Sequence, residues 1–262
     1  MRALIAGEGA LPTLLFEVMD AKPMICALEG FEPDVLHSDH VFRLETLGTL
    51  LRIIQENGVK DVTFAGRIRR PEIDPQKIDT ATLPLVPVLQ RALTSGDDGA
   101  LRAVLGIFED AGFRILGAHE ICPELVLAEG VPTERQPTEV EQQDGARGAD
   151  VLRLLSPGDV GQACVVHNNQ VLTIEGAYGT DWMLESLRKR PDGGGGLLVK
   201  GPKQGQDLRV DMPSIGPETV SQAKAAGLSG IAIAAGQVLI LEREEVLSRC
   251  AQEGLFLWSR SS

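Results

Sequence analysis

The chain has 262 residues, 43% of them hydrophobic and 24% charged, which is the mixture of a soluble globular protein with two domains. Its formal net charge of −12 argues against a nucleic-acid binder, which would normally carry a basic face. No apolar run approaches the roughly 20 residues that cross a bilayer, and the apolar start is too short for a signal peptide. The four cysteines lack the paired spacing of a zinc or dithiol site, so we expect a cytoplasmic protein with its cysteines in the core.

The first half of the chain alternates short apolar runs with amphipathic segments. This rhythm predicts a parallel, doubly wound (Rossmann-like) α/β domain over residues 1–130. The predicted strands are Arg2–Ala6, Met24–Leu28, Val59–Ala65 and Phe113–Gly117, and the predicted helices are Leu11–Met19, Leu44–Gln55, Leu83–Leu93 and Leu101–Ala111.

Residues 131–148 are polar, rich in Glu and Gln and without apolar periodicity, which predicts a linker. Residues 149–262 then form a second, α+β domain. Its predicted strands are Ala163–His167 and Gln170–Glu175, joined by a tight turn at Asn168-Asn169, with Leu197–Lys200, Gly230–Ala234, Val238–Leu241 and Leu255–Trp258. Helices are expected at Asp181–Arg190, from Pro217, and at Glu242–Glu253. We expect the active site in the cleft between the two domains.

Two loops of the first domain follow its strands directly. Gly7 and Gly9 stand between a strand and a helix, where backbone N–H groups could meet a phosphate, although the third glycine of a dinucleotide fingerprint is missing. Arg67, Arg69 and Arg70 follow the third predicted strand at the same sheet edge and could contact a diphosphate. A tight turn and a solvated loop are the competing interpretations.

The segment Lys200–Val220 is dense in mixed charge and ends in a rigid glycine–proline turn. If residues 207–211 form a strand, Asp207, Arg209 and Asp211 share one face. A guanidinium between two carboxylates suits a phosphate and a hard cation together, because Arg binds phosphate oxygens and Mg²⁺ takes carboxylate oxygens. The alternative is a salt-bridged edge strand.

Acidic residues also flank a glycine turn at Glu175–Asp181. Thr180 could cap the helix that follows and Asp181 could lie in its first turn, which is a complete structural explanation. The alternative is that Glu175 or Asp181 completes a metal site begun by Asp207 and Asp211.

Four segments together resemble the UDP-2,3-diacylglucosamine pyrophosphatase family of lipid A biosynthesis in Gram-negative bacteria. They are GQD-x-R-x-D-x-P-x-x-GP-x-TV at 205–220, IAGEGALP near the amino end, DVGQACVV at Asp159–Val166 and IEGAYGTDWM at Ile174–Met183. The resemblance extends from Leu4 to about Trp258. The chain departs from the family pattern at Tyr178 and Trp182, and in the order of residues in GPKQGQD before the first motif.

The resemblance implies a Mg²⁺-dependent hydrolase, other divalent cations being an alternative, that yields UMP and 2,3-diacylglucosamine 1-phosphate. We expect Asp211 to be the essential carboxylate, with Asp207 and Asp181 in support and with Asp211, Asp181 and Glu175 as metal ligands. The substrate-binding set is Gly7, Gly9, Arg67, Arg69, Thr180, Lys200, Lys203, Gln206 and Arg209. Two acyl chains imply an apolar wall, for which Trp182, Met183, Leu184 and Met212 are candidates.

The same resemblance implies transient contact with the inner membrane leaflet, and a homodimer is a further expectation; no nucleic-acid partner is expected. Two other functions stay open from the residues alone. One is a nucleotide-sugar binding or glycosyl- or phosphoryl-transferring protein without hydrolase activity. The other is an interaction module whose charged strand is merely a solvated edge.

Overall fold

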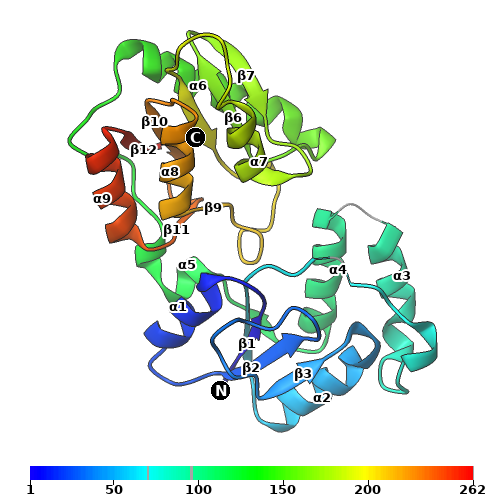
Figure 1. Ribbon diagram of the computed structural model, residues 1–262. Coiled ribbons are helices and arrows are strands. Elements are labelled where there is room, and N and C mark those ends of the chain that lie inside the picture. The colour runs from blue at the N-terminus through cyan, green and yellow to red at the C-terminus, as the bar shows by residue number, and fades with distance from the viewer. Residues whose placement is uncertain (70, 95–96, 262) are drawn as a thin grey trace. The chain divides into compact units, whose positions relative to one another are not determined.

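The computed structural model describes residues 1–69, 71–94 and 97–261, and it divides into two compact units (Figure 1). The first unit comprises Met1–Pro123 with Arg209–Asp211, and the second comprises Glu124–Leu208 with Met212–Ser262. Each unit has its own hydrophobic core.

The first unit is built on a five-stranded, all-parallel sheet. Its strands are β1 (Arg2–Ala6), β2 (Met24–Leu28), β3 (His40–Phe42), β4 (Asp61–Ala65) and β5 (Arg114–Ile115), in the order β3-β2-β1-β4-β5. This order is that of doubly wound sheets, with β1 and β4 at the point where it reverses. Successive residues of β1 are all buried from Ala3 to Ala6, so both faces of the sheet are covered. The predicted parallel α/β unit is confirmed, and β3 is an addition that the sequence pattern did not reveal.

The helices of the first unit follow from apolar spacing. They are α1 (Ala10–Val18), α2 (Leu47–Glu56), α3 (Val86–Thr94), α4 (Asp97–Asp110) and α5 (Ala118–Ile121), with 3₁₀ turns η1 (Leu44–Thr46), η2 (Pro75–Lys77) and η3 (Leu83–Leu85). In α2, Leu47, Leu50, Leu51 and Ile54 are buried at intervals of three and four residues, which places them on one face. Helices α3 and α4 pack against each other (Figure 1).

The second unit contains a mixed five-stranded sheet. Its strands are β6 (Ala163–His167), β7 (Gln170–Ile174), β8 (Leu197–Lys200), β10 (Gly230–Ala234) and β12 (Phe256–Arg260), in the order β12-β10-β8-β6-β7. Strands β8, β10 and β12 are parallel, whereas β6 is antiparallel to both β7 and β8. The other elements are α6 (Glu139–Leu155), α7 (Gly179–Ser186), α8 (Pro217–Ala225), α9 (Arg243–Glu253), η4 (Pro123–Leu125), η5 (Ser156–Gly158) and the strand pair β9 (Ser214–Ile215) with β11 (Leu239–Ile240).

The parallel half of this sheet departs from the predicted α+β arrangement. Helix α8 lies in the chain between β8 and β10, and α9 lies between β10 and β12. The two helices pack against each other, as Figure 1 shows in orange and red. Parallel neighbours require such crossovers, so this half of the unit has α/β character and the hairpin β6–β7 completes a mixed sheet.

The prediction of a linker at residues 131–148 is wrong in its local structure, because helix α6 occupies more than half of that segment. Thr138 and Glu141 form a reciprocal capping box at its start: the Thr138 side chain accepts from the Glu141 amide and the Glu141 carboxylate accepts from the Thr138 amide. The buried positions of α6 include Gly145 and Gly148, where a Cβ would come within 2.5 Å of Trp258 and 2.4 Å of Val199. Because the buried face of α6 consists of glycines and paired acids, the sequence shows no apolar periodicity there. The boundary between the two units lies before this helix, after Pro123.

A buried carboxylate on α6 fixes the predicted hairpin turn. Asn168 and Asn169 have φ values of 49° and 63°, the left-handed conformation that a tight two-residue hairpin turn requires. Their backbone amides donate to the two carboxylate oxygens of Asp144, which is 1% exposed (3.1 and 2.6 Å). The helix and the hairpin thus hold each other in place.

Candidate active site

The centre of the candidate site is a buried lysine at the carboxyl end of β8. Lys200 is 8% exposed, and its Nζ donates to Thr180 Oγ1 at 2.7 Å. The Thr180 hydroxyl in turn donates to Glu175 Oε2 at 2.6 Å. Burial lowers the pKa of Lys200, and the nearby Glu175 and Asp181 carboxylates oppose that effect. Three predicted residues, Lys200, Thr180 and Glu175, therefore form one hydrogen-bonded chain.

The first turn of α7 lies beside this lysine. Thr180 and Asp181 are its second and third residues, so the capping role that the sequence suggested for Thr180 is wrong. Its hydroxyl bonds Glu175 and Lys200 instead. The ammonium group and the positive end of the helix dipole lie together, which favours an anion such as a phosphate at this place.

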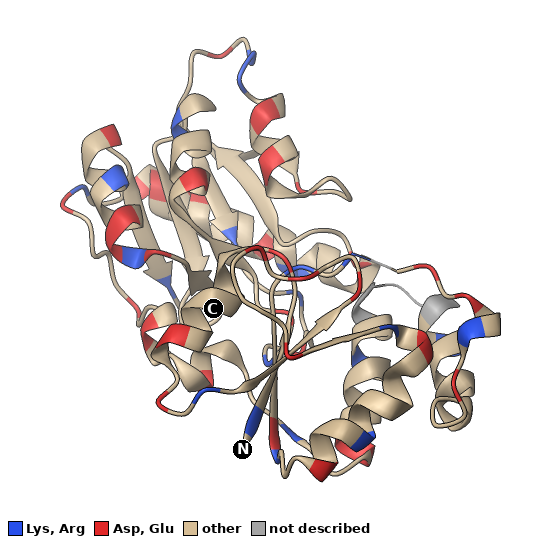
Figure 2. Ribbon diagram, turned by 60° about the horizontal axis from the view of Figure 1, so that its bottom comes forward, with Lys and Arg blue, Asp and Glu red and all other residues tan. Residues whose placement is uncertain are grey.

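Lys200 also lines a pocket of about 610 Å³ at the carboxyl ends of the parallel strands. Ala234 at the end of β10 and Arg260 at the end of β12 belong to the same lining. The charged residues of the described lining are Asp150, Arg153, Lys200, Lys203 and Arg260. Acidic positions are spread over many elements of the chain (Figure 2), so four cations around one pocket are a local excess of positive charge. Ligands of parallel sheets gather outside this end of the strands.

Arg260 is a pocket residue that the sequence analysis missed. Its buried Nε finds no hydrogen-bond partner within the described part of the chain, and its guanidinium carbon lies 5.6 Å from the Trp258 ring centroid. Burial lowers the pKa of Arg260, an effect that Asp150 opposes. A buried donor without an acceptor is rare in proteins and suits an anionic ligand. The only sequence signal was its place at the end of the last strand, beyond all the motifs.

Lys203 and Gln206 shape the loop that closes the pocket. The Lys203 ammonium pairs with Asp159, and its backbone amide donates to Gln206 Oε1 at 2.8 Å. Both predicted residues therefore belong to the pocket lining, with Lys203 held by a carboxylate.

The predicted charged strand at 207–211 is wrong. These residues, all within the described part of the chain, contain a turn at 208–210 and no strand. The three residues predicted to share one strand face belong to different units: Asp207 belongs to the second unit, and Arg209–Asp211 belongs to the first. Arg209 donates to Glu109 Oε1 on α4 at 2.7 Å, and Val210 packs on the core of the first unit. Contacts with that unit, and not pairing with a neighbouring strand, set the backbone here.

The glycine and arginine loops of the first unit do share one sheet edge, as predicted. Glu8 and Arg67 form an antiparallel bridge through their backbones, and Arg69 pairs with the Glu8 carboxylate at 3.1 Å. A Cβ on Gly7 would lie 2.6 Å from the Arg67 carbonyl oxygen, so close backbone approach explains this glycine. Gly9 has a φ of 99°. The phosphate role of this edge stays a prediction, and Arg70 lies outside the described residues.

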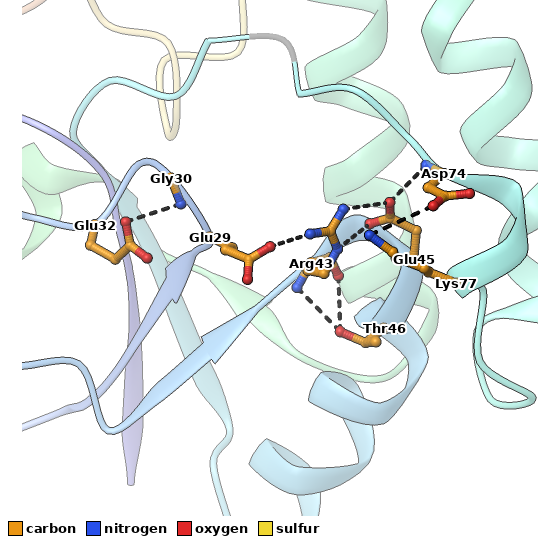
Figure 3. Close-up of polar contacts among 8 residues, drawn as sticks. All are labelled: Glu29, Gly30, Glu32, Arg43, Glu45, Thr46, Asp74 and Lys77. Atoms are coloured by element: carbon orange, nitrogen blue, oxygen red, sulfur yellow. Dashed lines mark hydrogen bonds and ion pairs between the residues drawn. The ribbon is translucent and has the colours of Figure 1, made fainter.

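In a second polar cluster of the first unit, the charged side chains pair with one another (Figure 3). Arg43, just after β3, bonds Glu29 and Glu45, and Glu45 also accepts from the Asp74 amide at 2.8 Å. Glu45 is 2% exposed. Burial tends to raise the pKa of this carboxyl, but hydrogen bonds from Arg43 and the Asp74 amide lower it overall.

Glu175, Asp181 and Asp211 are the predicted metal ligands. Glu175 and Asp181 belong to the second unit and Asp211 to the first. No group of three His, Cys, Asp or Glu side chains with metal-binding geometry occurs among residues 1–69, 71–94 and 97–261. The metal-binding role of the three carboxylates stays a prediction.

Two of the four residues predicted to form an apolar wall belong to the core instead. Met183 and Leu184 are 1% and 0% exposed within the core of the second unit, and Met212 is half-buried. Trp182 is 61% exposed, and its ring lies 5.4 Å from that of Tyr178. Within the described ranges, none of the helices is long and apolar enough to cross a membrane.

Comparison with known proteins places both units in one family. The LpxI N-terminal domain matches residues 1–125 and the LpxI C-terminal domain matches residues 128–258. The chain belongs to the LpxI family. A LpxI relative, the UDP-2,3-diacylglucosamine pyrophosphatase LpxI of Caulobacter vibrioides, is 36% identical over 266 residues, which cover 97% of this chain and 95% of the relative. The family resemblance drawn from the motifs is confirmed, and each LpxI domain coincides closely with one of the two units.

Proposed function

We propose that this LpxI-family chain is a UDP-2,3-diacylglucosamine pyrophosphatase of lipid A biosynthesis. Its match to the Caulobacter relative over nearly the whole of both chains carries the proposal. The reaction adds water across the diphosphate: one P–O bond of the bridge breaks, and the products are UMP and 2,3-diacylglucosamine 1-phosphate.

The pocket at the ends of β8, β10 and β12 supports the chemistry of that substrate. A diphosphate brings negative charge, and the buried Lys200 and the half-buried Arg260 offer positive charge to receive it. In a site shielded from water such interactions are stronger than at the surface, and charge that grows on the bridging oxygen as the bond breaks is stabilised most. Lys200 is already oriented by Thr180, so it needs little rearrangement when the ligand arrives.

Asp211 is the proposed essential carboxylate. It could orient the attacking water or accept its proton, the usual roles of a carboxylate in hydrolysis. Asp207 and Asp181 are proposed to support it, and Gln206 and Lys203 to hold the diphosphate.

A requirement for Mg²⁺ is part of the proposal. Mg²⁺ commonly keeps several waters and binds through one or two carboxylates together with substrate phosphates, so a complete protein cage is not needed. Asp211, or Asp181 with Glu175, would supply those oxygens. A bound Mg²⁺ would neutralise phosphate charge.

The direct test is product analysis with the purified protein. We expect UMP from UDP-2,3-diacylglucosamine in Mg²⁺ without any acceptor molecule, and no UMP after addition of a chelator. UMP that persists in excess chelator would contradict the metal requirement alone. Absence of UMP despite binding of the substrate would contradict hydrolysis and favour a binding or transferase function.

A further inference from the structure

His119 is a histidine of the first unit at the carboxyl end of β5. The amide of Leu116 still donates to the Val62 carbonyl of β4 at 2.9 Å, so the sheet ends just before Gly117. Helix α5 begins at Ala118, and His119 is its second residue. The helix lies near α1 and the end of β4 (Figure 1). His119 therefore belongs to the edge of the parallel sheet outside which ligands gather.

The imidazole ring of His119 packs on the backbone of Gly117. A Cβ at Gly117 would lie 2.6 Å from Cε1 of the ring and 2.8 Å from Nδ1, so a glycine is required beneath it. The Gly117 amide donates to Glu120 Oε2 at 2.6 Å, which fixes the turn that carries the ring. The orientation of His119 is thus set by its own neighbours in the sequence.

The same glycine lies against the segment that carries Asp211. The position of a Gly117 Cβ is 3.1 Å from the Cα of Arg209, two residues before Asp211. The Arg209 side chain is held in turn by Glu109 on α4. His119 and Arg209–Asp211 all belong to the first unit. The histidine ring and the segment of the proposed essential carboxylate therefore pack on one glycine.

The two ring nitrogens of His119 have different surroundings. Nδ1 is buried and finds no hydrogen-bond partner in the described part of the chain, whereas the residue as a whole is only partly buried. Among the described residues, Nε2 is not one of the buried unpartnered atoms. A buried N–H without an acceptor costs free energy, so the ring carries its proton on Nε2. Nε2 is then a neutral hydrogen-bond donor.

We propose that His119 is a catalytic residue that donates a hydrogen bond from Nε2 to a phosphoryl oxygen of the substrate. The inference rests on the proposed function, in which Asp211 orients the attacking water or accepts its proton. Negative charge grows on the phosphate oxygens as the P–O bond of the bridge breaks, and a donor that is already oriented stabilises that charge. The proton stays on His119 throughout, so the ring supplies a hydrogen bond and no acid–base step.

Three substitutions of His119 separate a donor at Nε2 from packing on Gly117. His119→Gln brings an amide N–H₂ close to the position of Nε2, because its side chain has a similar reach. His119→Asn brings the same group only to the position of Nδ1, and His119→Ala removes both. The matched control is His37→Ala, at an exposed histidine of the same unit.

The experiment measures kcat and KM for UDP-2,3-diacylglucosamine with Mg²⁺, together with thermal unfolding of each variant. We expect kcat of His119→Asn and His119→Ala to fall about a hundredfold, because a donor to the transition state is lost. KM should stay within about threefold of the wild type, since the bond is strongest in the transition state. His119→Gln should keep kcat within about tenfold of the wild type, and His37→Ala should leave it unchanged.

A role in packing alone gives a different pattern. Equal loss of kcat in His119→Gln and His119→Asn, in step with loss of thermal stability, overturns the donor role. Near-normal kcat of folded His119→Ala overturns it as well, and the comparison of Gln with Asn decides if the alanine variant does not fold. Release of UMP by the wild type leaves the proposed function standing in both cases. Absence of UMP with the wild type overturns the proposed function and this inference with it.

Discussion

The two units each carry a hollow at the carboxyl ends of parallel strands, yet the hollows differ in chemistry. In the first unit, β2 and β3 end in Leu28 and Phe42, and the cavity is apolar. In the second, β8 and β12 end in Lys200 and Arg260, and the pocket is cationic. The topology places a ligand site in both cases. The residues that end the strands decide what that site can bind.

The charges of the two units are also used differently. In the first, Arg43 is matched by Glu29 and Glu45 in a closed network (Figure 3). In the second, the buried Nε of the half-buried Arg260 has no hydrogen-bond partner among the described residues.

The largest expected effect comes from Asp211, a charged residue in the lining of the apolar hollow and the proposed essential carboxylate. Asp211→Asn keeps the size of the side chain, removes its negative charge and its capacity as a base, and weakens it as a metal ligand. We expect kcat to fall by about a thousandfold or more, with substrate binding retained. The matched control is Asp34→Asn, an exposed aspartate of the same unit, which should leave kcat unchanged. Near-normal turnover of Asp211→Asn would remove this residue from the mechanism.

A substitution of Lys200 tests the cationic pocket of the second unit. Lys200→Met should lower kcat/KM about a hundredfold, because a buried charge that meets the diphosphate is lost. Lys189→Met, at an exposed lysine of the same unit, should have little effect.

The pH profile of Lys200 adds a second measurement to the same prediction. Its pKa is lowered by burial, so the ammonium loses its proton at a lower pH than an ordinary lysine. Activity should therefore decline on the alkaline side before the usual lysine range is reached. Lys200→Arg, which stays charged, should move that decline to higher pH. An alkaline limb that is identical in wild type and Lys200→Arg would show that another group causes it.

The smallest expected effect concerns the network that supports the wall of the apolar hollow. Leu44 and Ile73 line the cavity, and they adjoin Glu45 and Asp74 in sequence. Glu45→Gln should destabilise the fold by about 2 kcal/mol, because it weakens a buried charge pair and a backbone hydrogen bond. Glu29→Gln, at the exposed partner of Arg43, should cost less than about 0.5 kcal/mol.

Urea unfolding at neutral and acid pH checks this prediction. The pKa of Glu45 is lowered in the folded state, so its contribution is present above the ordinary glutamate value and is lost as pH falls through the folded value. The difference between wild type and Glu45→Gln should therefore shrink toward acid pH. A difference that grows on acidification would contradict the lowered pKa.

Apolar rhythm in the sequence predicted those elements whose buried faces are apolar. Strands β1, β2 and β6 have the predicted bounds, because each is a nearly continuous apolar run between turn residues. Helix α6 escaped prediction for the opposite reason. Its packed face uses Gly145, Gly148 and a carboxylate bound to backbone amides, which read as polar and flexible in a sequence.

The site was predictable where a motif and a strand end coincide. Lys200, Thr180 and Glu175 were named in advance, and the structure joins them by hydrogen bonds. Arg260 lies some fifty residues beyond the charged motif and joins the pocket only through the β8-β10-β12 order. The strand expected at 207–211 failed because charge alternation alone does not supply a pairing partner. Non-local pairing of this kind is invisible in local sequence pattern.

Gly148 lies in a stretch whose polar composition is typical of a linker, yet close packing allows only glycine at this position. Its bare backbone lies against Val199, the residue before Lys200 in β8. Even one methyl group at this position would force α6 and β8 apart. Substitutions on the solvent face of α6 leave this contact unchanged. A side chain at Gly148 would instead displace β8, the strand that ends in Lys200.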